Sequence, residues 1–153
     1  MINISIVIPI YNEEYVLKKE IIKIIKELGD ILGENQYEIL LVNNGSTDQT
    51  LNIANELATK NNFISIINLK KPAYGEALRL GINQSKGDYV TIFNIDFWDI
   101  GFLKSSIMLL KTNEYAFIVG SKLIANNFDN RGIFRKFISI IFNHRLMLFF
   151  GFM

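Results

Sequence analysis

Short apolar runs rich in β-branched residues alternate with helical patterns along the chain. The runs predict strands at residues 4–10, 38–42, 63–68, 89–93 and 116–119. They show little alternation of apolar and polar positions, which is typical of parallel strands buried on both faces. We therefore expect a mainly parallel sheet that is covered by helices.

Apolar residues between these runs recur at helical spacing. One helix should bury a single stripe and end at Gly29 or Gly33; the stripe consists of Leu17, Ile21, Ile24 and Leu28. A second helix is predicted to open with a capping box formed by Ser46 and Gln49. Two more helices are expected over residues 75–84 and 103–111.

This order of strands and helices predicts a doubly wound α/β fold of the Rossmann type, with helices on both faces of the sheet. In such sheets ligands bind beyond the carboxyl ends of the strands. The loops that follow residues 9, 42, 68 and 93 should therefore share one crevice.

Composition narrows the functional classes. Half of the 153 residues are hydrophobic and 20% are charged, which indicates a globular domain with a hydrophobic core. A formal net charge of +1 argues against a nucleic-acid partner. The absence of cysteine excludes thiolate sites and is compatible with a cytoplasmic location, and a single histidine excludes a multi-histidine metal site. We expect neither a signal peptide nor a transmembrane helix.

The first two crevice loops offer aromatic and polar side chains. Pro9, Tyr11 and Glu13 combine an aromatic face with a carboxylate, as a site for a base or ribose would. Asn43 and Asn44 end the second strand and point toward the same crevice. Helix capping and an ordinary strand-to-helix turn are the structural alternatives for these loops.

The third and fourth loops suit phosphates and a cation. Lys71 and Gly75 lie near a helix start, where phosphates bind well, although loop lysines are usually only solvated. Asn94 and Asp96 lie two apart, so on extended backbone they would point the same way. Their oxygens beside a diphosphate would suit Mg²⁺ or Mn²⁺, unless Asp96 simply ends a strand.

Taken together, these loops resemble the family 2 glycosyltransferases of the GT-A fold. That family's pattern runs from Pro-x-Tyr-Asn-Glu through Asp-Asp-Gly-Ser-x-Asp to Asp-x-Asp, and the resemblance covers residues 4 to 122. It implies a nucleotide-sugar-binding core at residues 1–122, with Pro9, Tyr11 and Glu13 on the nucleotide. It places Asn43 and Asn44 at the base and ribose.

The same resemblance assigns residues to the diphosphate and to the metal. Gly75 and Arg79 match a segment beside the sugar diphosphate, and Lys71 or Arg79 would stabilise this leaving group. Asn94 and Asp96 fall on the metal motif. Asn94 replaces its first acid, so we expect weaker but retained binding of Mg²⁺ or Mn²⁺, with Asp99 as a further ligand.

Residues 123–153 are predicted to form a separate, incomplete, basic amphipathic segment. Residues 131–150 resemble the region of dolichyl-phosphate mannose synthase and related polyprenyl-phosphate sugar synthases in which basic residues precede a membrane-facing helix. A core helix of a missing remainder is the alternative. The resemblance implies a peripheral position on the cytoplasmic face of a membrane.

The expected function is transfer of a sugar, with inversion, from a GDP- or UDP-sugar to a polyprenyl phosphate. That acceptor is already anionic and needs no strong general base. One alternative is a glycan-building enzyme with a sugar-hydroxyl acceptor, which would need a carboxylate base. The other is a nucleotide-sugar-binding or assembly module without catalysis. The sequence does not indicate an oligomeric state.

Overall fold

The computed structural model describes residues 4–32, 36–112 and 114–120. The chain divides into two compact units, Met1–Phe117 and Ile118–Met153. The helices and strands of the described residues all belong to the first unit. The predicted amphipathic segment at residues 131–150 lies outside the described residues.

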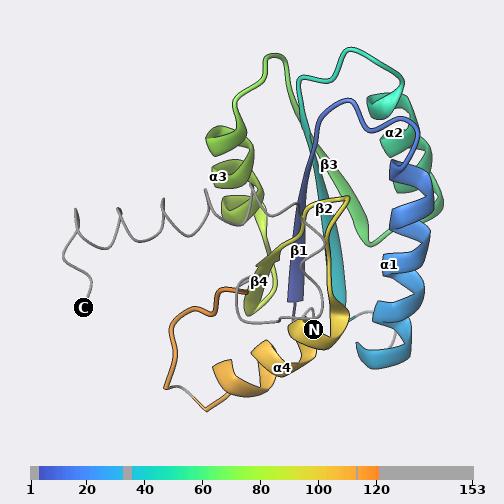
Figure 1. Ribbon diagram of the computed structural model, residues 1–153. Helices are drawn as coiled ribbons and strands as arrows, with labels where there is room; N and C mark the ends of the chain where they lie inside the picture. The colour runs from blue at the N-terminus through green and yellow to red at the C-terminus, as the bar shows by residue number, and fades with distance from the viewer. Residues whose placement is uncertain (1–3, 33–35, 113, 121–153) are drawn as a thin grey trace, which may run out of the picture. The chain divides into compact units, whose positions relative to one another are not determined.

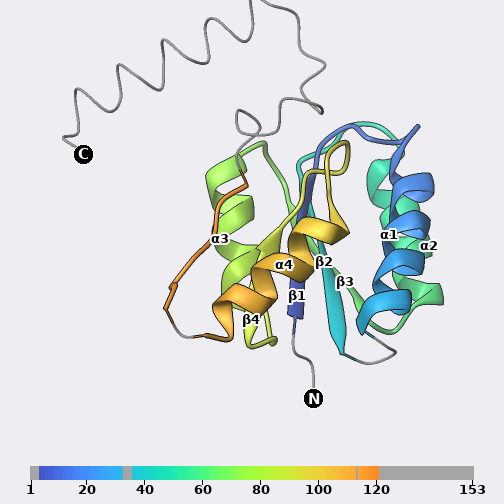
Figure 2. The same ribbon diagram turned by 60° about the horizontal axis from the view of Figure 1, so that its bottom comes forward.

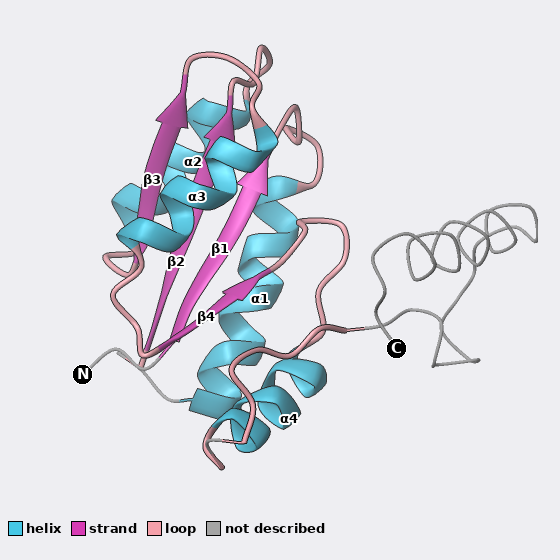
Figure 3. Ribbon diagram, turned by 90° about the vertical axis from the view of Figure 1, so that its left-hand side faces the viewer, coloured by secondary structure: helices cyan, strands magenta, loops and turns pink. Residues whose placement is uncertain are grey.

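A parallel sheet forms the centre of the first unit. It consists of β1 (Ile4–Ile10), β2 (Tyr37–Asn44), β3 (Ile64–Leu69) and β4 (Tyr89–Ile92), in the order β3-β2-β1-β4. Every pair of neighbours is parallel, as Figure 3 shows. The prediction of a parallel sheet is therefore confirmed, and β1 and β2 lie at its centre.

Helices cover both faces of this sheet. They are α1 (Leu17–Leu32), α2 (Thr50–Lys60), α3 (Tyr74–Gln84) and α4 (Ile100–Leu110). α1 and α2 lie on one face and α3 on the other (Figures 1 and 2). α4 contacts α1, and its buried Ile100 and Leu103 belong to one apolar cluster with the buried residues of α1. The predicted doubly wound α/β architecture is confirmed.

The predicted stripe of α1 is buried as expected. Its members are fully inaccessible to solvent, namely Leu17, Ile21, Ile24 and Leu28. Burying each such side chain contributes on the order of 1.5–3 kcal/mol to folding. Of the two predicted ends, Gly29 is wrong, because the helix continues to Leu32, the residue directly before Gly33. Four well-buried side chains outweigh the roughly 1 kcal/mol helix penalty of one glycine.

On the face of the sheet that α3 covers, Ala77 packs with Val7 and Val42 in a second, smaller apolar cluster. Gly81 allows α3 to lie close to this face. A Cβ at Gly81 would come within 2.4 Å of Val7 Cγ1 and 3.2 Å of Val42 Cγ2. Only a glycine allows this approach without displacing side chains of β1 and β2. The start of α3 is thereby brought beside the carboxyl ends of these strands.

The predicted strand at residues 116–119 does not form. These residues have no regular secondary structure, and Phe117 and Val119 are 78% and 75% exposed. A strand is stabilised by hydrogen bonds to a neighbouring strand. Within the described residues β4 is an edge strand of the sheet, and residues 116–119 do not pair with it. A short apolar run alone was not enough to specify a fifth strand.

The predicted capping box at the start of α2 is also wrong. α2 begins at Thr50, and Gln49 in the N-cap position makes no side-chain capping bond. Instead, Asp48 Oδ1 accepts a hydrogen bond of 2.9 Å from Thr50 N. Ser46 bonds to the first crevice loop and does not act as a cap.

Candidate active site

An open cleft lies at the carboxyl ends of β1, β2 and β4, where the strand order reverses between β1 and β4. This is the place where doubly wound sheets bind ligands. The cleft has a volume of about 260 Å³, near the lower end of the range for small-molecule sites. It is lined by Pro9, Ile10, Tyr11, Glu13, Asn44, Tyr74, Asn94, Ile95 and Asp96.

Residues 11–14 are joined to residues 46–50 by a set of hydrogen bonds that we call the interloop network. Asn12 adopts a left-handed conformation with φ of 55°, which asparagine tolerates better than most residues. Its backbone N–H donates to Ser46 Oγ at 3.1 Å, and its Oδ1 accepts from Thr47 N at 2.9 Å. The first and second loops therefore hold each other in place.

Three further bonds extend the interloop network toward α2. Glu13 N donates to Thr50 Oγ1 at 2.7 Å, and Glu14 N donates to Asp48 Oδ2 at 3.3 Å. In return, Gln49 N donates to Glu14 Oε2 at 3.0 Å. The Glu13 backbone is thereby fixed at the cleft, which its side chain lines.

Glu13 lies in a negative environment. Partial burial raises the pKa of its carboxyl group, and the nearby charges of Asp96 and Asp48 raise the pKa further. Mutual repulsion between carboxylates disfavours their charged forms unless a cation compensates. Glu13 and Asp96 thus interact unfavourably at the cleft, and a bound cation would relieve this repulsion.

Asn94 and Asp96 both line the cleft, but on a tight turn and not on extended backbone. Phe97 N donates to Asn94 O at 3.0 Å and closes the turn. Ile95 between them is only 3% exposed and packs into the core below. Both residues line the same cleft, but the predicted extended backbone between them is wrong.

Asn43 and Asn44 have different environments although they are adjacent. Asn43 is 1% exposed; its Nδ2 donates to Asn68 Oδ1 at 2.7 Å and its Oδ1 accepts from Ser46 N at 3.3 Å. Asn44 Oδ1 accepts from Ala73 N at 2.6 Å, and Asn44 lines the cleft. Of this pair, only Asn44 lines the cleft.

Comparisons with known proteins decide the family. The family model described as "Glycosyl transferase family 2" matches residues 5–151 of the chain. The chain belongs to glycosyl transferase family 2. The resemblance expected from residues 4 to 122 is thus confirmed, and the match extends further, to residue 151.

Family 2 relatives with long matches carry polyprenyl-phosphate names. A dolichyl-phosphate beta-glucosyltransferase of Trichomonas vaginalis is 30% identical, over 88% of this chain and 43% of its own length. An undecaprenyl-phosphate 4-deoxy-4-formamido-L-arabinose transferase of Photorhabdus laumondii is 31% identical, over 92% of this chain and 42% of its own. The chain spans less than half the length of these relatives.

A solved structure has the same fold. The crystal structure of S. aureus TarS residues 1–349 superposes with a TM-score of 0.60 at 21% identity, over 72% of this chain and 33% of that one. TarS has also been solved in complex with UDP. Within the residues that the structure describes here, no helix combines the length and apolar character needed to cross a bilayer.

Lys71 belongs to the third loop, and its backbone lies close to Gly45 of the second loop. Gly45 has φ of +73°, and a Cβ there would come within 2.7 Å of the Lys71 carbonyl carbon. Both its conformation and this close approach require glycine. Lys71 itself is exposed and does not line the cleft, although its backbone lies close to Gly45.

Three other predicted site residues lie outside the cleft lining. Arg79 makes a two-pronged ion pair with Glu76, at 2.8 Å from Nε and 2.6 Å from Nη2, which raises the pKa of Arg79. Asp99 caps α4 by accepting from Phe102 N at 2.8 Å. A Cβ added at Gly75 would meet no surrounding atom within 4 Å, so this glycine faces open space.

Sequence reasoning missed Tyr74 as a site residue. It is the first residue of α3, is 53% exposed and lines the cleft with Tyr11, which is 46% exposed. Two exposed tyrosines at one cleft suit a planar base or a sugar ring. The signal in the sequence was the position of Tyr74 directly before Gly75, in a loop already expected to face the crevice.

Proposed function

We propose that the cleft binds the nucleoside-diphosphate sugar of a glycosyltransfer reaction. The observation that carries this proposal is the convergence of Tyr11, Glu13, Asn44 and Asp96 from three strand ends on one open cleft at the switch point. Membership of family 2 supports it. The donor class is a GDP- or UDP-sugar.

Asp96 and Asn94 suit a divalent cation. They supply one carboxylate and one amide oxygen, and Glu13 adds a second carboxylate to the lining. The described residues contain no cluster of three acidic, histidine or cysteine side chains that could hold a metal unaided. Mg²⁺ and Mn²⁺ sites on nucleotides need only one or two carboxylates, because the diphosphate supplies further oxygens. When bound, such an ion neutralises the leaving diphosphate.

The acceptor that we propose is a polyprenyl phosphate, and the transfer inverts the anomeric centre. The dolichyl-phosphate and undecaprenyl-phosphate names of the relatives support the acceptor class. The chain's own residues would hold the donor, orient its anomeric carbon toward the open side of the cleft and leave attack to the anionic acceptor. Such an acceptor requires no proton transfer to a protein base.

Calorimetric titration of UDP-sugars and GDP-sugars, with and without Mn²⁺, tests donor binding. We expect binding that Mn²⁺ strengthens, together with Mn²⁺-dependent enhancement of water proton relaxation in the presence of nucleotide. Failure of every nucleoside diphosphate to bind would overturn the proposal. Binding without any Mn²⁺ effect would overturn only its metal component.

A transfer assay tests the acceptor. Radiolabel from the donor should enter an organic-extractable polyprenyl phosphate, and NMR of the product should show an inverted anomer. Label that enters only a polar glycan would point to a sugar-hydroxyl acceptor. Binding without transfer or hydrolysis, in the chain extended to the length of its relatives, would point to a non-catalytic module.

A further inference from the structure

Asp96 depends on the backbone around it for its position at the cleft. Its carboxylate makes no hydrogen bond or ion pair with another described residue. Burial raises the pKa of Glu13 and the charge of Asp96 raises it further, so the two carboxylates repel each other. This repulsion favours their separation. The segment that carries Asp96 must therefore be held in place by other residues.

Residues on both sides of Asp96 attach this segment to the core. Before it, Ile95 is 3% exposed and belongs to the apolar cluster that includes the buried face of α1. After it, the partly buried side chain of Trp98 packs against the same cluster. Apolar packing is not directional, whereas a hydrogen bond also fixes the orientation of the ring.

Trp98 has such a directional contact with α1. Its indole Nε1 donates a hydrogen bond of 3.3 Å to Glu20 Oε2. Glu20 is itself held, because its Oε1 accepts from Lys23 Nζ at 2.8 Å and its side chain is only 18% exposed. The hydrogen bond from Lys23 lowers the pKa of Glu20, and the one from Trp98 lowers it further. Trp98 therefore donates to a charged and already oriented acceptor, which strengthens the bond.

We propose that Trp98 and Glu20 form a positioning pair that holds Asp96 at the cleft for a divalent cation. This inference rests on the proposed function of the cleft. The pair ties the segment after Asp96 to α1, and the carbonyl of Glu13 is tied to the start of the same helix by Leu17 N at 2.9 Å. Both carboxylates are thereby held relative to one helix, against their mutual repulsion. A cation that bridges them to a diphosphate would meet ligands already in place.

Calorimetry of UDP and GDP, each with and without Mn²⁺, tests the pair in the 153-residue chain. The measured quantity is the Mn²⁺ effect, the ratio of nucleotide affinity with the ion to nucleotide affinity without it. Trp98→Phe keeps an aromatic ring but removes the indole N–H, and Glu20→Ala removes its acceptor. Each variant should lower the Mn²⁺ effect by at least about threefold and leave metal-free nucleotide affinity within about twofold.

Two further variants separate positioning from simple stabilisation. The double variant should be no worse than either single one, because all three lack the same hydrogen bond. Glu20→Gln keeps an acceptor oxygen and should recover most of the Mn²⁺ effect. A pair that only stabilises the fold would lower the thermal unfolding temperature and leave the Mn²⁺ effect of the unaltered chain. That result would overturn the inference.

Fluorescence gives a second readout that needs no ligand. Trp98 is the only tryptophan of the chain, so quenching of the emission by acrylamide reports on this side chain alone. Glu20→Ala should increase the quenching, because the indole loses its partner on α1. Unchanged quenching would show that the hydrogen bond does not hold Trp98, and would overturn the inference.

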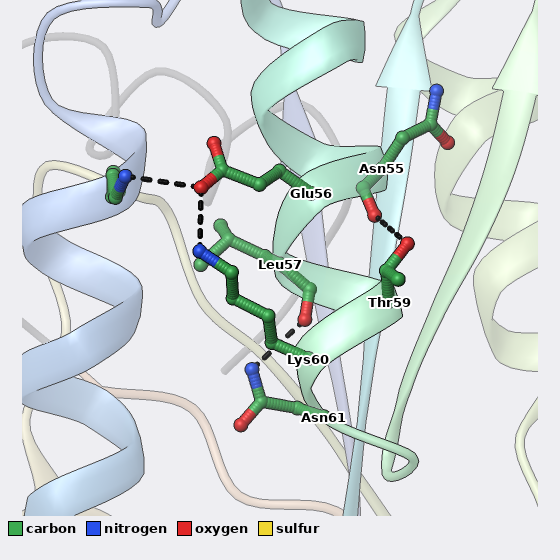
Figure 4. A network of polar contacts seen from close by, with 7 residues as sticks. Asn55, Glu56, Leu57, Thr59, Lys60 and Asn61 are labelled. Carbon is green, nitrogen blue, oxygen red and sulfur yellow. Dashed lines mark hydrogen bonds and ion pairs between the residues drawn. The ribbon is translucent and has the colours of Figure 1, made fainter.

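Glu56→Ala is the matched control. Glu56 also joins α1 to another element, because its carboxylate accepts from Lys18 of α1 at 3.3 Å and from Lys60 of α2 at 2.7 Å (Figure 4). It does not line the cleft, so the Mn²⁺ effect and the quenching of Trp98 should both stay unchanged.

The unaltered chain separates failure of this inference from failure of the proposed function. If Mn²⁺ does not change its nucleotide affinity, the metal component of the proposed function fails, and this inference fails with it. If Mn²⁺ strengthens binding equally in the unaltered chain, in Trp98→Phe and in Glu20→Ala, only this inference fails.

Discussion

The two ends of the central strands use polar residues in opposite ways. At the amino ends, Glu38 is 4% exposed and accepts from Ser5 Oγ and from Lys86 N, both at 2.6 Å. Ser5 Oγ in turn accepts from Gly87 N at 2.9 Å. At the carboxyl ends, Asp96 lines an open cleft and its carboxylate makes no hydrogen bond or ion pair with another described residue.

This difference separates polar groups that stabilise the fold from those that are available to a ligand. The buried network around Glu38 satisfies its members and joins the α3–β4 loop to β1 and β2. Buried polar groups need such partners, because leaving one unsatisfied costs about 1–3 kcal/mol. Exposed polar groups without protein partners at one end of the sheet are therefore candidates for binding a ligand.

The largest effect is expected at the amino end. Glu38→Ala removes the acceptor of the Ser5 hydroxyl and leaves the Lys86 N–H with only its longer bond to Ser5 Oγ, at 3.1 Å. The free energy of unfolding should therefore fall by about 2–4 kcal/mol in urea titrations. Nucleotide affinity of the folded protein should not change. Glu38→Gln keeps an acceptor oxygen and should lose much less stability. Equal stability of all three proteins would contradict the structural role.

The converse effect is expected at the carboxyl end. Asp96→Asn removes an anionic ligand from the cleft, so nucleotide-sugar affinity in the presence of Mn²⁺ should fall by at least about tenfold. Stability should stay the same or rise, because Asp96 also repels Glu13. Calorimetry and urea unfolding of the same sample measure both. A large loss of stability with unchanged affinity would reverse the assignment of this end.

A smaller effect is expected from the aromatic lining. Tyr74→Ala removes a ring that faces the cleft, so nucleotide-sugar affinity should fall by about three- to tenfold, with little change in unfolding temperature. Tyr74→Phe should retain most of the affinity. Tyr15→Ala is the control, because Tyr15 is 91% exposed and does not line the cleft. If both alanine variants bind alike, Tyr74 is not a ligand contact.

The smallest effect concerns pH and the interloop network. Burial alone would raise the pKa of Asp48, but hydrogen bonds from Thr50 and Glu14 outweigh it and hold the pKa below the usual 3.8. The corresponding stabilisation is complete above about pH 4 and disappears as pH falls through the lowered pKa. In Asp48→Asn, the decline of stability below about pH 4 should be shallower. An unchanged acid slope in pH-dependent urea titrations would contradict this.

Periodic features could be predicted from the sequence. The spacing of Leu17, Ile21 and Ile24 identified the buried face of α1 because helical geometry alone brings these positions together. The apolar runs located the four strands to within one or two residues at most ends. The gathering of Asn94 with the residues of the first two loops followed from the rule that parallel strands end at one edge.

Contacts between distant residues could not be predicted. Asn43 and Asn44 read alike in the sequence, yet their roles are set by Asn68 and Ala73, which follow 25 and 29 positions later. The capping box failed for the same reason, since Ser46 bonds to Asn12, 34 positions earlier. Local patterns contain no information on which of several partners a polar side chain will meet.

The interloop network also bears on how quickly and how tightly a ligand can be captured. Asn12, Glu13 and Glu14 are already held by Ser46, Thr50 and Asp48 in the folded chain. The loss of backbone entropy on this side of the cleft therefore occurs during folding and is not subtracted from the binding free energy. A ligand of the cleft would meet a preorganised surface on this side, and its association there would need no prior rearrangement of the chain.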